Sequence, residues 1–194
     1  MPRGAVVRGW NRQVGRMGFT AIELLVGMAV AAVLIGVAIP SFQTLMQSYR
    51  LNGAARQVVS EIRAAQSLAV KRADVFGFHW GGDPDVTNYS NGEYRIERRA
   101  GTACTDWPDQ DATMDNLNVI TNWFDLSGEF RGVTITSIQD SGGNDLNGVV
   151  FNSRGASVGA CGGPPVFPLT VTLSNGSGET RSIQVKRTGS VKVL

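Results

Sequence analysis

Histidine and cysteine are nearly absent from this chain of 194 residues, which contains one His and two Cys. His79 and the distant pair Cys104 and Cys161 do not match a zinc-ligand spacing, and the chain has no C-x-x-C. The hydrolase signatures G-x-S-x-G and H-E-x-x-H are also missing. A Ser/His/Asp arrangement would have to use His79, and nothing in the sequence places a nucleophile beside it. We therefore expect no enzyme, no metal site and no cofactor.

One acidic stretch follows a cation-binding pattern only in part. The start of an EF-hand loop is matched by four residues: Asp109, Asp111, Thr113 and Asp115. However, Met114 stands where that loop needs Gly for its turn, and Ile120 stands where it needs the bidentate Glu. The stretch is better interpreted as a solvated acidic loop.

A general excess of positive charge is lacking as well. The formal net charge is +2, but four arginines and no acid lie in residues 1–18. The remaining residues have 14 basic and 16 acidic side chains, for a net charge of −2. The balance therefore does not indicate a generally nucleic-acid-binding protein.

Charge is almost missing from residues 19–39, which form an apolar run broken only by Glu23. About 20 apolar residues can cross a membrane as a helix. The arginines before the run predict a cytoplasmic N-terminus, with the bulk of the chain on the other side. A carboxylate within such a span costs about 2.5–3.5 kcal/mol, so Glu23 is a functional candidate. Hydropathy alone is equally satisfied by an uncleaved single-pass anchor.

The order of residues at the start of the run is more specific. Gly18-Phe19-Thr20-Ala21-Ile22-Glu23-Leu24-Leu25, with Pro40 closing the run, resembles the class III signal of type IV prepilins and type II secretion pseudopilins. The resemblance implies that prepilin peptidase cuts between Gly18 and Phe19 and that Phe19 is N-methylated. It also implies that Glu23 pairs with the terminal amine of a neighbouring subunit, which lowers the cost of both charges. Alternatively, the negative charge of Glu23 interacts favourably with the dipole at the N-terminus of its own helix.

An amphipathic pattern follows Pro40. Apolar residues recur at steps of three and four, and form one stripe: Leu51, Ala55, Val58, Ile62, Ala65 and Ala69. Other faces have polar side chains: Arg56, Ser60, Arg63, Ser67 and Lys71. We expect one long helix over about residues 19–72, whose stripe docks on a β-sheet. The expected organisation is a leader (1–18), a membrane or filament-core half of the helix (19–40), an amphipathic half (41–73) and a β-rich globular domain (74–194).

The rest of the chain predicts antiparallel strands. The candidates are 75–80, 93–97, 132–138, 149–151, 166–173, 181–187 and 190–194, several of which alternate in hydropathy. Asn175-Gly176 is a hairpin signal, and Thr188-Gly189 is a candidate turn or bulge in the last pair. The fold class is α+β, a long N-terminal helix packed on antiparallel sheet, and pilin-like by resemblance.

Later segments resemble a narrower branch, the FimT/GspH-type minor pilins and pseudopilins. Three segments are similar to it: residues 51–72, Val150-Phe151-Asn152-Ser153-Arg154-Gly155, and the ending 183–193. The resemblance implies a minor subunit of a type IV pilus, at or near the tip, that primes assembly. The alternatives are a GspH-like pseudopilin of a type II secretion system and a FimT-like pilin that binds DNA for uptake. A membrane-tethered domain that forms no filament is a further alternative.

Two features after the membrane segment complete these expectations. Cys104 and Cys161 would lie outside the cytoplasm, where they should form a disulfide. The tail has a basic set that could contact DNA phosphates: Arg181, Lys186, Arg187 and Lys192. FimT-type competence pilins have Gly-Arg-x-Arg near this ending, whereas this chain has Gly189-Ser190-Val191-Lys192. Lysine cannot make arginine's planar bidentate contact, so a charged edge hairpin is the better interpretation.

The expected partners follow from the same resemblance. They are prepilin peptidase, the inner membrane and other pilins or pseudopilins contacted through the N-terminal helix, with DNA a weaker alternative. The expected location is the bacterial inner membrane as a single-pass protein, and then a periplasmic or extracellular filament.

Overall fold

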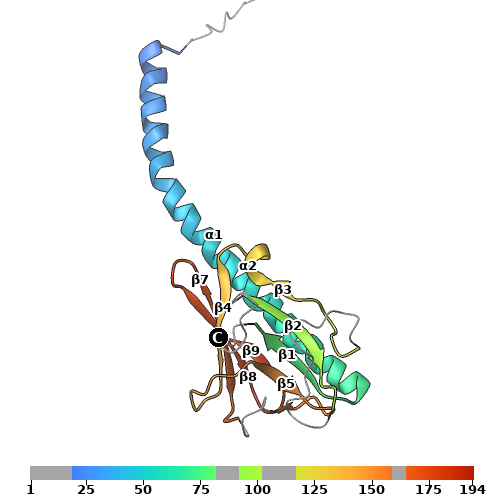
Figure 1. The fold of residues 1–194 in the computed structure, drawn as a ribbon. Helices are drawn as coiled ribbons and strands as arrows, with labels where there is room; N and C mark the ends of the chain where they lie inside the picture. Colours follow the sequence, from blue (N-terminus) through green and yellow to red (C-terminus); the bar gives the residue numbers. More distant parts are fainter. Residues whose placement is uncertain (1–18, 82–91, 102–116, 159–164) are drawn as a thin grey trace, which may run out of the picture. The chain divides into compact units, whose positions relative to one another are not determined.

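The computed structural model describes residues 19–81, 92–101, 117–158 and 165–194. The chain forms two units, Met1–Phe42 and Gln43–Leu194, and each is described by itself. One helix, α1 (Ala21–Arg72), contributes to both units. Within its described residues, the second unit also contains a short helix and nine strands. In chain order (Figure 1) these are β1 (Phe76–Trp80), β2 (Glu93–Arg98), β3 (Phe124–Asp125), α2 (Leu126–Glu129), β4 (Val133–Gln139), β5 (Gly148–Phe151), β6 (Ser157–Val158), β7 (Leu169–Asn175), β8 (Thr180–Val185) and β9 (Val191–Val193).

The strands form two antiparallel sheets. The first has the order β3-β2-β1-β5-β6, and the second has the order β4-β7-β8-β9. β1 is central in the first sheet, since Phe76 pairs with Arg98 of β2 on one side and with Phe151 of β5 on the other. Gly148 of β5 is required at this position, because a Cβ there would lie 2.4 Å from the carbonyl oxygen of Phe78.

The second half of α1 packs against these sheets. All six residues of the expected apolar stripe are buried, and Ala54 and Val59 widen it. The polar residues expected on other faces, from Arg56 to Lys71, are all exposed. The stripe belongs to one core with residues of both sheets, including Phe78, Phe151 and Leu173. The expected fold class is therefore confirmed: α+β, with a long helix packed on antiparallel sheet.

The two sheets are buried to different extents. β7 alternates strictly, with Leu169, Val171 and Leu173 buried and the intervening side chains partly exposed. The first four residues of β1 and all of β5 are instead buried on both faces. The second face of the first sheet has buried charged residues, which are described below.

Four turns share one backbone pattern. They begin at Asp140, Asn152, Asn175 and Lys186, and each has a glycine three residues later with φ between +75° and +83°. The glycine N–H donates to the carbonyl of the first residue, and the first residue's N–H donates to the carbonyl four residues on. In the first three turns the side-chain oxygen of Asp or Asn also accepts backbone N–H groups two and four residues later.

These turns explain where the sequence expectations were and were not accurate. A hairpin forms at Asn175-Gly176, but the residue with positive φ is Gly178. The strand expected over 181–187 ends at Val185, because Lys186 begins a turn that Gly189 completes. The strand expected from Val166 begins at Leu169, after Pro168, which has no N–H to donate. The short elements β3, α2 and β6 were not expected.

Candidate functional site

The first half of α1 presents an apolar surface on all sides. Every side chain described between Phe19 and Phe42 is exposed, including Leu25 at 66% and Val33 at 68%. This part of α1 is long and apolar enough to cross a membrane, judged by length and composition. A helix that is apolar all round needs an apolar environment or partner, and no described residue of the first unit covers this segment.

Glu23 lies in the first turn of this helix, where a carboxylate is favoured by the helix dipole. Its backbone N–H donates to the hydroxyl of Thr20 over 3.3 Å. Thr20 and Glu23 are three residues apart and match the capping box, a signal that the sequence contains but that was not used above. Thr20 therefore caps the helix through the backbone of Glu23, and this contact does not use the Glu23 carboxylate.

A shallow groove runs along the same face of this segment. It has a volume of about 410 Å³ and is lined by six residues: Phe19, Glu23, Leu24, Gly27, Met28 and Ala31. A Cβ added at Gly27 would meet no atom within 4 Å, so this glycine leaves an open notch one turn after Glu23. Small residues at such a position allow a second helix to approach closely.

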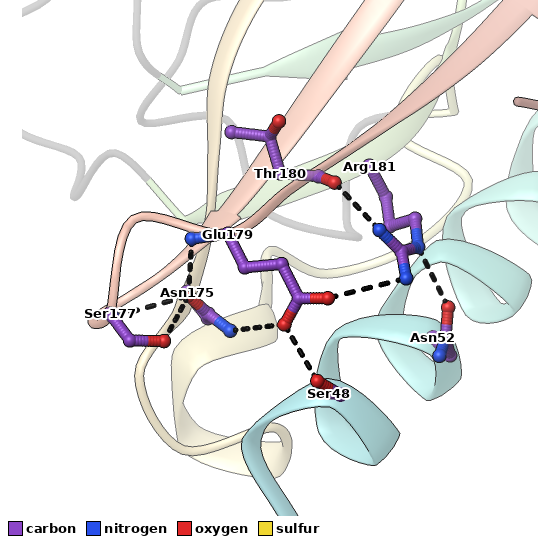
Figure 2. Close-up of polar contacts among 7 residues, drawn as sticks. All are labelled: Ser48, Asn52, Asn175, Ser177, Glu179, Thr180 and Arg181. Carbon is purple, nitrogen blue, oxygen red and sulfur yellow. Dashed lines mark hydrogen bonds and ion pairs between the residues drawn. The ribbon is translucent and has the colours of Figure 1, made fainter. Parts of the chain in front are cut away.

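In the second unit, Glu179 connects α1 to the β7–β8 hairpin (Figure 2). Its carboxylate accepts hydrogen bonds from the Ser48 hydroxyl at 2.7 Å and from the Asn175 amide at 3.2 Å. The other carboxylate oxygen lies 3.3 Å from a guanidinium nitrogen of Arg181. Arg181 also donates to the side-chain oxygen of Asn52 over 3.0 Å. The hairpin is thus held to two turns of α1 by side chains from five residues.

This network removes Arg181 from the predicted phosphate-binding set. Arg181 is partly buried and paired with Glu179 at one end of β8, whereas Lys186 and Arg187 lie in the turn at the other end. Lys192 is exposed on the edge strand β9, opposite Gln184. The four predicted cations therefore do not form one patch.

Other predicted residues lie outside the described part of the chain. These are Cys104, Cys161, Gly18 and the EF-hand-like stretch up to Asp115. The disulfide stays a prediction for this reason. Within the described ranges, no group of three or more His, Cys, Asp or Glu side chains could hold a metal ion.

A buried charged cluster was not expected from the sequence. On the second face of the first sheet, the Arg95 guanidinium bonds the Glu97 carboxylate, and His79 Nε2 lies 3.8 Å from the other Glu97 oxygen. The Trp123 ring covers Arg95, with 4.5 Å between the guanidinium carbon and the ring centroid. Strand pairing creates the cluster, because His79 lies opposite Arg95 in the β1–β2 register. The sequence signal that was available is the alternation Tyr94-Arg95-Ile96-Glu97, in which only one face is apolar.

The cluster shifts two pKa values in opposite directions. Burial, and secondarily the positive charge of Arg95, lowers the pKa of His79 to about 3, so His79 is neutral at neutral pH. Burial raises the pKa of Glu97 to about 7, although Arg95 opposes this shift. Among the described residues, the cluster has an Arg95–Glu97 ion pair and no group of side chains that could hold a metal ion.

Comparison with known proteins identifies similar structures at low sequence identity. No family model and no curated protein matches the chain. The minor pseudopilin EpsH from the type 2 secretion system of Vibrio cholerae is 14% identical, with a TM-score of 0.47 over 75% of this chain and 96% of EpsH. The type IV minor pilin FimU of Pseudomonas aeruginosa is 15% identical, with a TM-score of 0.48 over 77% of this chain and 92% of FimU. This chain is thus similar to one minor pseudopilin and one minor pilin.

Proposed function

We propose that this chain is a minor subunit of a type IV pilus, a structural protein that acts without catalysis. It is inserted in the inner membrane, cut between Gly18 and Phe19, N-methylated at Phe19 and assembled through residues 19–40 of α1. The globular unit is then displayed on the filament, at or near its tip, where it primes assembly with other minor pilins.

The observation that carries this proposal is the exposed apolar surface of the first half of α1. An ordinary secretory signal has a small-residue cleavage site after its apolar core. Here the small residue Gly18 precedes the core, so that cleavage leaves the whole apolar segment on the mature protein. Leaving such a surface in water is unfavourable, at about 25 cal/mol per Å². A membrane before assembly and neighbouring helices after it would both cover this surface.

Glu23 acts in this proposal as the charge that a neighbouring subunit neutralises. The notch at Gly27 lies one helical turn further on, and gives room for another chain beside the carboxylate. Pairing with the new terminal amine of a neighbour removes two isolated charges from an apolar bundle. The capping contact with Thr20 is compatible with this role, because it uses the backbone N–H of Glu23 and leaves its carboxylate available.

The cleavage step is tested by the mass and N-terminal sequence of the mature protein from membranes. We expect a chain that starts at Phe19 with one added methyl group. A mature chain that retains residues 1–18 would refute the proposal and favour an uncleaved anchor.

The role of Glu23 is tested by a pair of variants. Glu23→Ala should be cleaved normally but should enter filaments poorly, whereas Thr20→Ala should be cleaved and incorporated nearly as the unchanged chain. The readout is the amount of the subunit in sheared filaments relative to membranes. Equal loss of incorporation in both variants would mean that Glu23 acts only through the helix cap.

The choice between a pilus and a secretion pseudopilus has a direct test. Deletion of the gene should abolish surface pili and leave the secretion of exoproteins unchanged. Loss of secretion with normal piliation would assign the chain to a type II secretion system instead.

A further inference from the structure

A basic groove lies on the outer side of α1 in the second unit, away from the Glu179 network. Its volume is about 500 Å³, and its principal lining residues are Arg63, Gln66, Ser67, Val70, Lys71 and Arg154. The helix forms one wall, and the β5–β6 turn with Gly155 and the β8–β9 turn with Thr188 form the other. The sequence placed Arg63, Ser67 and Lys71 on a polar side of the helix, but it did not bring Arg154 to them.

The groove is held in shape by hydrogen bonds between its walls. The Gln66 amide donates to the carbonyl of Gly155 over 2.8 Å. The Ser157 N–H donates to the carbonyl of Arg187 over 3.0 Å and thereby joins the two turns. Gly189 lies under this junction, since a Cβ there would be 2.1 Å from the Gln66 amide nitrogen and 2.2 Å from the Gly155 oxygen. The groove therefore exists before any ligand binds.

The charge of the groove is of one sign. Three of its lining residues are cations and none is acidic. Among the described residues, Arg63, Lys71 and Arg154 take part in no ion pair, although Arg63 donates to the carbonyl of Val191 over 3.4 Å. Val70, an apolar side chain that is 53% exposed, precedes Lys71 in the same lining. The lining therefore suits a ligand with separated negative charges.

The helix sets the spacing of these features. Arg63, Ser67 and Lys71 follow one another at steps of four along a single row, which spans about 12 Å at about 1.5 Å per residue. An extended peptide covers that span in four residues, at about 3.3 Å per residue, and its alternate side chains point to the same side. Carboxylates at positions one and five would meet Arg63 and Lys71, and the side chain at position three would lie near Ser67.

We propose that the basic groove binds an extended acidic segment of a partner protein, with two acidic residues four positions apart. Two arginines favour carboxylates, because a guanidinium can bond both oxygens of one carboxylate. A nucleic acid is less well suited. No aromatic side chain lines the groove to stack on bases, and residues 19–194 have a net charge of −2, which repels a polyanion. This surface is independent of the proposed assembly through residues 19–40.

The test uses the full chain in neutral detergent micelles and the fluorescent peptide Gly-Glu-Ser-Ser-Ser-Glu-Gly, with blocked ends. Fluorescence anisotropy should show saturable binding that weakens when salt is raised from 0.05 to 0.3 M. The double variant Arg63→Gln/Lys71→Gln should raise Kd about tenfold or more. The control Arg50→Gln/Arg131→Gln removes the same charge from another part of the unit and should change Kd less than twofold.

Other outcomes would overturn the proposal. These are equal weakening by both double variants, equal binding of a peptide with Gln in place of both Glu, or tighter binding of a 20-base-pair DNA duplex than of the peptide. Circular dichroism at the same temperature identifies a variant that has lost its fold. In that case Arg154→Gln, a change in an exposed turn, takes its place, and unchanged Kd in that variant would also overturn the proposal.

Discussion

The two halves of α1 are made of the same secondary structure but differ in what covers them. Residues 21–39 are apolar on every side and exposed on every side that the structure describes. Residues 51–69 have one apolar stripe, and that stripe is completely buried in the core of the second unit, with Leu51, Val58 and Ile62 at 0% exposure. The difference shows that apolar content does not predict burial within the chain. The second half is packed against the sheets of its own unit, whereas the first half is covered by no other described residue.

The largest expected effect comes from a substitution in the buried stripe of the second half of α1. Ile62→Ala should lower the free energy of unfolding of the second unit by about 3–4 kcal/mol, because it leaves a cavity between helix and sheets. The matched variant Ile35→Ala, at a side chain that is 57% exposed, should change it by less than about 0.5 kcal/mol. Chemical denaturation followed by tryptophan fluorescence measures both. Similar losses would mean that the two halves are stabilised in the same way.

The next effect tests how tightly the second half is enclosed by the turns. Gly189→Ala should cost about 3 kcal/mol, since φ is +83° and a Cβ would clash with the Gln66 side chain and the Gly155 backbone. Gly143→Ala is the control, because its φ is also +83° but nothing lies within 4 Å. It should cost only about 1 kcal/mol. Equal costs would show that the strain is purely local and that the junction with Gln66 contributes nothing.

The stability of the second unit should depend on pH through His79 and Glu97. The pKa of His79 is lowered from its ordinary value to about 3, so the unfolded chain binds a proton below pH 6.5 that the folded chain does not. Stability contributed by neutral His79 should therefore fall by about 2 kcal/mol between pH 6.5 and 5. Glu97 acts in the opposite direction. Its raised pKa, about 7, contributes stability that is lost as the pH rises from about 4.5 toward 7.

His79→Gln separates the two contributions. Comparison of its denaturation midpoints with those of the unchanged chain at pH 5, 5.75 and 6.5 isolates the histidine. The variant should lack the acid-dependent loss that His79 causes. If the difference between the two chains is the same at all three values, His79 does not titrate in the expected window.

The smallest expected effect tests whether the packed half of α1 begins at Ser48. Ser48 is bonded to Glu179 from the β7–β8 hairpin, three residues before the first fully buried residue of α1. Ser48→Ala should lower the free energy of unfolding by about 1 kcal/mol, because it removes one hydrogen bond to the Glu179 carboxylate. Ser60→Ala, on the exposed face, should be neutral or slightly stabilising because Ala favours helix. Equal thermal midpoints for both variants would show that the Glu179 network does not hold the hairpin to α1.

Much of the fold could be predicted because it depends on local periodicity. The stripe of α1 was found from its steps of three and four, and the seven expected strands all exist with shifted ends. Two of the end shifts have a local cause: β8 stops at the turn from Lys186 to Gly189, which has positive φ, and β7 starts only after Pro168. Short elements such as β3 and β6 have two residues each, and no periodicity can be read from so few.

The candidate sites also fall into two groups, those built from residues close in the sequence and those built from distant segments. The apolar run, Glu23 and the Thr20–Glu23 spacing are contiguous in the chain, so the sequence by itself determined them. It also determined the amphipathic stripe, since a helix places every third and fourth residue on one face whatever surrounds it. Only the tertiary structure decided that Arg181 pairs with Glu179 and Asn52, that His79, Arg95 and Glu97 share a buried face, and that Arg154 joins Arg63 and Lys71 in one groove. These residues are brought together by strand register and by the docking of turns on α1, which depend on contacts between distant segments.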